Sequence, residues 1–124
     1  MSRQLVRSER GSGSMLMVGV MTVMVMLSLG AVCLAGYLVA VHRARSAADL
    51  AALSGAVAYS SHGDGCAAAR SNARRNHARV VSCEQLGDSV EFLLSVKVEV
   101  EVQVGVVGLP RTIQAAAHAG AVAR

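Results

Sequence analysis

The longest uncharged stretch of the chain runs from Gly11 to Val41 and contains no Asp, Glu, Lys, Arg or His. A bilayer core about 30 Å thick is crossed by roughly 20 apolar residues in helical form. Residues 15–41 therefore predict a transmembrane helix. We expect the chain to retain this helix, because the apolar core of a cleaved signal peptide is only about 7 to 15 residues long.

The same helix is predicted to continue beyond the membrane, because no helix-terminating residues occur before the segment from Tyr59 to Gly65. About 80 residues remain outside the transmembrane helix, which is enough for one small domain. The predicted division of the chain is an N-terminal tail at 1–14, a transmembrane helix at 15–41, a stalk helix at 42–62 and a small domain at 63–124.

Small residues follow one side of the predicted stalk. Residues four apart share a helix face, and small side chains on that face let another backbone approach closely. We therefore expect this face to pack either against another subunit or against the chain's own small domain, and the sequence leaves both partners open. The first row of this face is Ala44, Ala48, Ala52 and Ala56, and the adjacent row is Ala47, Ala51 and Gly55.

Beyond the stalk, Asp64 is placed to cap a second helix over residues 65–78. The period then changes to two, because every even position from Val90 to Val106 is apolar. This alternation indicates one long half-buried strand. Residues 80–85 are its expected antiparallel partner, across turn-forming residues at 86–89.

The last segment, residues 112–122, carries two conflicting signals. Its alternation of apolar residues favours a third strand beside the long one, whereas its alanine richness leaves a helix open. A third strand also makes physical sense, since a two-stranded hairpin alone is marginally stable. The predicted fold class is α+β, with a long transmembrane and stalk helix followed by a small domain of one helix and a short antiparallel sheet.

Cys66 and Cys83 are the two cysteines of the predicted small domain, whereas Cys33 lies inside the predicted transmembrane helix. The chain has two Tyr, one Phe and no Trp, so the core of this domain must be built from smaller side chains. Two cysteines in a small domain with a weak core predict a disulfide, and a disulfide requires an oxidising compartment. The small domain is therefore expected outside the cytoplasm.

Arginines on the two sides of the apolar stretch give the same orientation. The positive-inside rule places the more basic flank in the cytoplasm. We therefore predict a single-pass plasma-membrane protein with a cytoplasmic N-terminus and an extracytoplasmic C-terminal domain. The preceding flank carries Arg3, Arg7 and Arg10, and the following flank carries Arg43 and Arg45.

The sequence lacks the motifs of the common enzyme classes. It contains no glycine-rich phosphate loop, CxxC pair, HExxH or GxSxG, and its four histidines are scattered. We therefore predict no enzyme activity, no cofactor and no metal site. The basic residues after the stalk could contact anionic lipid or nucleic acid, but we interpret them as a solvated face. No aromatic residues for base stacking lie among them, which disfavours a nucleic-acid site. These residues are Arg70, Arg74, Arg75 and Arg79.

Two segments of the chain resemble a known family. The segment Glu9–Ser14 before a single apolar helix, and the segment Arg45–Ala56 after it, are similar to TadE/TadG-like pilus-assembly proteins. Later parts of the chain resemble an actinobacterial TadE-like branch found beside helicase and secretion genes. They are Cys66 with its alanine-rich helix, the segments Val80–Cys83, Leu109-Pro110 and Ala117–Gly120, and the valine-rich strand. The resemblance covers most of the chain.

The resemblance implies a minor pilin or pseudopilin of a tight-adherence pilus or secretion apparatus. Its expected partners are the membrane, other pilin-like or TadE/TadG-like subunits, a membrane assembly platform and further copies of the chain, joined through the alanine-rich stalk. Nucleic acid is not an expected partner. The alternative is an uncleaved single-pass envelope protein that presents a disulfide-closed, ligand-binding domain and remains a monomer.

The resemblance also raises the question of proteolytic processing. Family members with a prepilin cleavage site carry Glu five residues after the Gly that precedes the cut. Gly11 and Gly13 are the candidate glycines here, but Leu16 and Val18 occupy the corresponding positions. Processing after either glycine therefore stays open at the level of the sequence.

Overall fold

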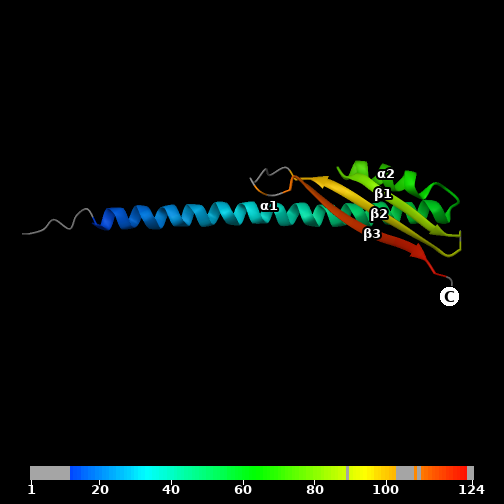
Figure 1. Ribbon diagram of the computed structural model, residues 1–124, viewed down its shortest axis with the longest axis horizontal. Helices are drawn as coiled ribbons and strands as arrows, with labels where there is room; N and C mark the ends of the chain where they lie inside the picture. Colours follow the sequence, from blue (N-terminus) through cyan, green and yellow to red (C-terminus); the bar gives the residue numbers. More distant parts are fainter. Residues whose placement is uncertain (1–11, 89, 103–107, 109, 123–124) are drawn as a thin grey trace, which may run out of the picture. The chain divides into compact units, whose positions relative to one another are not determined.

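The computed structural model describes residues 12–88, 90–102, 108 and 110–122. The chain divides into two compact units, Met1–Ala35 and Gly36–Arg124, and the second unit contains the end of the long helix with all later elements (Figure 1). The α+β class predicted from the sequence is confirmed. The elements in order are α1 (Ser12–Ser60), α2 (Gly65–Arg75), β1 (Arg79–Gly87), β2 (Phe92–Glu101) and β3 (Thr112–Ala121).

Helix α1 ends within the predicted terminating segment, at Ser60. The Gly63 N–H donates to the Ala58 carbonyl at 2.8 Å, and the His62 N–H donates to the Tyr59 carbonyl at 2.9 Å. This pair of bonds is the Schellman arrangement, which satisfies carbonyls that have no partner at a helix end. The residue with positive φ is His62, at 64°, although the neighbouring glycine would adopt that conformation at lower cost.

Helix α2 begins with the expected cap, because the Asp64 carboxylate accepts a hydrogen bond from the Ala67 N–H at 2.9 Å. It ends at Arg75, three residues before the position expected from the sequence. A second Schellman arrangement ends it there: the Ala78 N–H donates to the Ala73 carbonyl at 2.9 Å, and His77 has φ of 55°. No glycine follows Arg75 closely enough to predict the end of α2 from the sequence.

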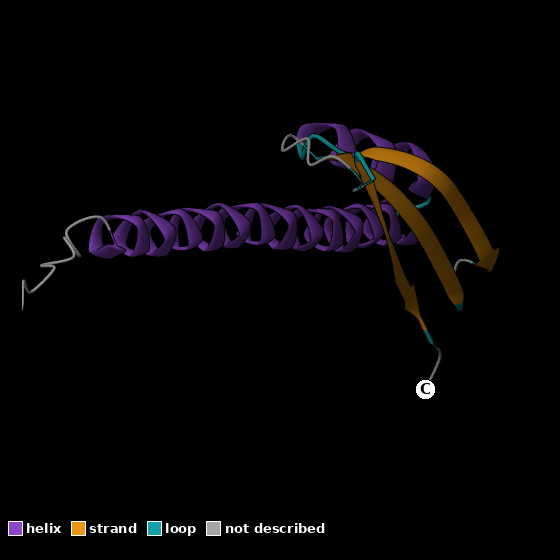
Figure 2. Cartoon of the chain, turned by 60° about the vertical axis from the view of Figure 1, so that its left-hand side comes forward, coloured by secondary structure: helices purple, strands orange, loops and turns teal. Residues whose placement is uncertain are grey.

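The three strands form one antiparallel sheet in the order β1-β2-β3 (Figure 2). The last segment is therefore a strand, as the alternation favoured. Strand β2 is shorter than expected at its start, because Val90 lies in the hairpin connection and is 70% exposed. The expected continuation through residues 103–106 lies outside the described residues.

The core lies on one face of the sheet. The inward-facing residues of β2, from Phe92 to Val100, are buried, and small residues of α1 and α2 pack on them. The two helices therefore cover the same face, in a two-layer arrangement. At one end of this core the Tyr59 ring packs edge-on against Phe92, with 4.8 Å between the ring centroids.

A β-bulge in β1 decides which of its side chains face this core. The register with β2 shifts between Val80 and Ser82, so that Val80 pairs with Val98 while Cys83 pairs with Val96. Successive strand side chains point to opposite faces, so an unbroken strand would turn Val80 and Cys83 to opposite sides. One extra residue in the bulge puts both on the core side.

Candidate functional site

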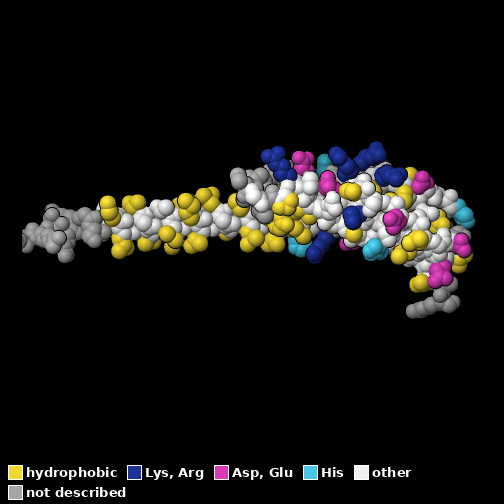
Figure 3. Space-filling model, viewed as in Figure 1, with side chains coloured by type: hydrophobic (Ala, Val, Ile, Leu, Met, Phe, Trp, Pro, Cys, Tyr) yellow, Lys and Arg dark blue, Asp and Glu magenta, His cyan; other side chains and the backbone are white. Residues whose placement is uncertain are grey.

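The part of α1 in the first unit has the surface of a membrane-spanning helix. Its large apolar side chains are exposed in the structure, with Met15 at 83% and Leu27 at 69%. Within the described residues, one helix is long and apolar enough to cross a membrane, and it is α1. Figure 3 shows hydrophobic side chains along this part and charged side chains gathered over the other unit. An exposed apolar surface of this extent is typical of a region that contacts a membrane or another protein.

The alanine-rich face of α1 lies inside the second unit. All seven residues singled out from the sequence are buried there, and five of the alanines belong to the same core cluster as the inward-facing residues of β2. Of the two packing partners left open by the sequence, the structure therefore supplies the chain's own domain. A second subunit has no access to this face while the domain is folded. The buried positions are Ala44, Ala47, Ala48, Ala51, Ala52, Gly55 and Ala56.

Helix α1 closely approaches α2 and β2 at Gly55. A side-chain carbon at this position would overlap the Leu94 side chain and would lie 2.7 Å from the Gly65 carbonyl oxygen. A carbon at Gly65 would in turn lie 2.9 Å from the Gly55 carbonyl oxygen. These two glycines therefore let α1 and the start of α2 approach with backbone against backbone, while Leu94 fills the space beside them.

The opposite side of α1 in the second unit carries a different set of side chains. Leu50, Leu53 and Val57 are 44%, 58% and 59% exposed, although they are among the largest apolar residues of this part of the helix. Their spacing of three and four residues places them on one face. The sequence analysis did not predict this face, because it considered only the alanine-rich face of the stalk. The helical spacing of these three apolar residues could have identified it.

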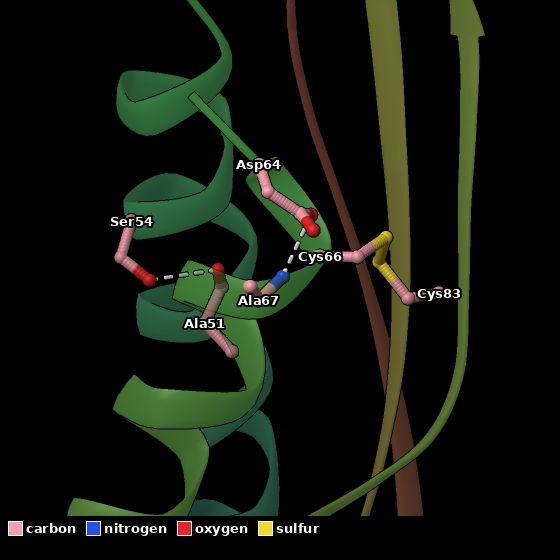
Figure 4. Close-up of a disulfide and its surroundings, with 6 residues drawn as sticks. All are labelled: Ala51, Ser54, Asp64, Cys66, Ala67 and Cys83. Atoms are coloured by element: carbon pink, nitrogen blue, oxygen red, sulfur yellow. Dashed lines mark hydrogen bonds between the residues drawn. A yellow bond between two sulfur atoms is a disulfide. The ribbon is translucent and has the colours of Figure 1, made fainter.

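The second unit is closed by a disulfide between Cys66 on α2 and Cys83 on β1, with the two Cα atoms 5.9 Å apart (Figure 4). The bond joins the helix to an edge strand near the capped start of α2. Cys33, in the first unit, is a free cysteine. Of the candidate processing residues, Gly13 lies in the first turn of α1 with open space around it, and Gly11 lies outside the described residues.

A serine and a histidine lie close together on the sheet face that the helices leave uncovered. Ser95 Oγ and His118 Nδ1 lie 2.8 Å apart on neighbouring strands, and both side chains point away from the core. A serine and histidine at this distance resemble half of a nucleophilic triad. The pair is exposed to solvent, whereas a catalytic triad acts in a water-excluded site beside preorganised oxyanion donors. In the described part of the chain, no group of three His, Cys, Asp or Glu side chains is arranged to hold a metal.

Comparison with known proteins gives one match. Residues 11–58 match the family model described as putative Flp pilus-assembly TadE/G-like. No curated protein and no solved structure matches the chain. The matched residues coincide with α1 and include both its apolar part and its alanine-rich face, whereas α2 and the sheet lie beyond the match. Together with the apolar helix, this similarity indicates a membrane-anchored protein that carries a TadE/G-like pilus-assembly segment over residues 11–58.

Proposed function

We propose that the protein is a structural component of a tight-adherence (Flp) pilus or a related secretion apparatus, acting as a minor pilin or pseudopilin. The observation that carries this proposal is the coincidence of the TadE/G-like match with a single helix, α1. That helix has one part with exposed apolar side chains and another part that holds a small domain. A helix of this kind serves to anchor and to assemble, so its role is structural.

The proposed topology keeps the N-terminal tail, residues 1–14, in the cytoplasm and residues 15–41 in the membrane. Residues 42–62 then form the stalk, and residues 63–124 complete the extracytoplasmic domain. Two features support this orientation. The arginines of the tail outnumber those that directly follow the apolar stretch, and the Cys66–Cys83 disulfide is suited to an oxidising compartment.

The proposed contact with other subunits lies on the exposed face of α1 and not on its alanine-rich face. The spacing of Leu50, Leu53 and Val57 is that of successive core positions in a pair of packed helices. Helices anchored through the same membrane in the same orientation run parallel, so a second pilin-like helix can lie along this face. Covering these three side chains would remove from water an apolar surface that the domain leaves exposed.

A triple variant, Leu50→Gln, Leu53→Gln and Val57→Gln, tests this contact in a host that assembles the apparatus. Gln preserves helix propensity, so we expect the domain to keep its thermal stability while co-purification with pilin-like subunits falls at least about tenfold, the equivalent of about 1.4 kcal/mol. The matched control changes Arg70, which is exposed on α2, to Gln and should retain association.

A photo-reactive side chain at Leu53, compared with one at Arg70, identifies the neighbour directly. Cross-links from position 53 to a pilin-like helix or to a second copy support the proposal. A stable triple variant that associates normally would contradict it. A monomeric wild-type protein in assembling cells would favour the alternative, an uncleaved envelope protein that presents a ligand-binding domain.

Processing is tested separately by the intact mass of protein extracted from the host membrane. A mass lower by residues 1–11 or 1–13 identifies a processed pilin-like subunit. A full-length mass identifies an uncleaved anchored component, which agrees with the missing Glu after each glycine. A gain of two hydrogens on reduction reports the disulfide in the same experiment.

A further inference from the structure

An open groove of about 1000 Å³ lies within the second unit, between α1 and the ends of α2 and β2. Its α1 wall is apolar at Gly36 and Val39 and becomes basic at Arg43. Arg75 and His77, at the end of α2, line a second wall. The groove therefore combines an apolar strip with basic side chains that come from two different elements.

The groove is lined by side chains of the kinds that bind a phosphodiester. Arg43 and Arg75 can each donate two hydrogen bonds to phosphate oxygens, and guanidinium groups bind phosphate in this bidentate manner. The Ser46 hydroxyl also lines the groove and can donate a hydrogen bond. The side-chain amide of Asn76 lines it too, but it already donates to the backbone and side-chain oxygens of Asn72. Glu101 lines it as well and can accept a hydrogen bond from a hydroxyl of the bound group.

The position of the groove along α1 indicates which kind of phosphate-bearing ligand it can bind. Gly36 and Val39 belong to the uncharged stretch that ends at Val41, and Arg43 is the first arginine after it. In the proposed membrane topology, this transition lies at the level of the lipid headgroups. Basic pockets at that level bind anionic headgroups, and the apolar strip of α1 can face the attached acyl chain.

We propose that this groove binds the headgroup of an anionic glycerophospholipid, with Arg43 and Arg75 holding its phosphate and Glu101 accepting a hydrogen bond from a headgroup hydroxyl. The bound lipid fixes the domain against the membrane surface at the point where α1 leaves the bilayer. The proposal rests on the membrane anchoring described under the proposed function, but it does not depend on assembly into a pilus.

The test uses full-length protein in detergent, with phosphatidylglycerol as the probe and native mass spectrometry to count retained lipid. The double variant Arg43→Gln and Arg75→Gln should lose retention at least about tenfold, because each arginine near a headgroup contributes a substantial share of the affinity. The double variant Arg70→Gln and Arg79→Gln removes the same charge from exposed positions that do not line the groove. It should retain the lipid as the wild type does.

Three results would overturn the proposal. They are an equal loss in both double variants, retention of phosphatidylcholine as strong as that of phosphatidylglycerol, and displacement of the lipid by millimolar inorganic phosphate, which would identify a site for free anions. Flotation of the protein with vesicles separates this proposal from the membrane anchoring on which it rests. Protein that floats without selective retention contradicts the lipid site alone, whereas protein that does not float contradicts the anchoring itself.

Discussion

The two parts of α1 differ in how their apolar surface is covered, although one continuous helix contains both. In the first unit, large side chains such as Met15 and Leu34 are exposed. In the second unit, alanines such as Ala48 and Ala52 are almost fully buried against the sheet and α2. Large flexible side chains suit lipid or another irregular surface, while small ones allow a sheet or helix to approach closely. Side-chain size therefore distinguishes the two parts better than apolarity does.

The largest expected effect comes from truncating a leucine in each part. Leu94→Ala removes a side chain that is fully buried beneath the alanine-rich face of α1, and it should lower the free energy of unfolding by about 3 kcal/mol. Leu29→Ala, at a position 58% exposed in the first unit, should leave it unchanged. Urea unfolding in detergent, followed by circular dichroism, measures both. Equal effects of the two substitutions would contradict the difference in burial between the two parts of α1.

The cysteines provide a second test of the difference between the two units. Replacing Cys66 and Cys83 with serine removes a disulfide whose cysteines are 17 residues apart in the sequence. In the chain-entropy account this should lower the free energy of unfolding by about 3 kcal/mol. Cys33→Ser, in the first unit, should cost little. Thermal unfolding with and without reductant provides the measurement. A reductant-insensitive wild-type domain would show that the disulfide does not stabilise it.

The same glycine substitution should have opposite signs in the two parts. Gly55→Ala should destabilise the domain by about 2 kcal/mol, because the new carbon would overlap Leu94 and crowd the Gly65 carbonyl. Gly30→Ala has open space around it and should favour the helix by up to about 1 kcal/mol. Hydrogen exchange of the β2 amides reports the first effect, and exchange along α1 reports the second. A neutral Gly55→Ala would contradict the close approach.

The smallest expected effect concerns the end of α1. His62→Gly should stabilise the domain by about 0.5 kcal/mol, because glycine adopts the positive φ of this position without the steric cost of a side chain. His42→Gly provides the control, since this exposed residue lies inside the helix and its replacement should destabilise by about 1 kcal/mol. Thermal unfolding of the two variants should therefore shift in opposite directions.

Local periodicity was sufficient to predict much of this fold. The uncharged stretch predicted the apolar helix, Asp64 marked the start of α2, and the alternation after Val90 placed β2 and its neighbours. The predicted ends of the elements were less accurate. Helix α2 ends through backbone hydrogen bonds around His77, and no glycine at that position marks the end in the sequence. The start of β2 also moved from Val90 to Phe92, since the hairpin connection takes up Val90.

The sequence by itself determined the long apolar helix, the antiparallel strands and the two-residue alternation that forms one face of the core. These features are local, because they depend on side-chain type at a fixed period along the chain. Tertiary structure alone decided the partner of the alanine-rich face and left Leu50, Leu53 and Val57 exposed. It also placed the bulge after Val80 that turns Cys83 toward Cys66. Both features depend on contacts between segments that lie far apart in the sequence. A local sequence pattern cannot specify which of these segments pack against each other.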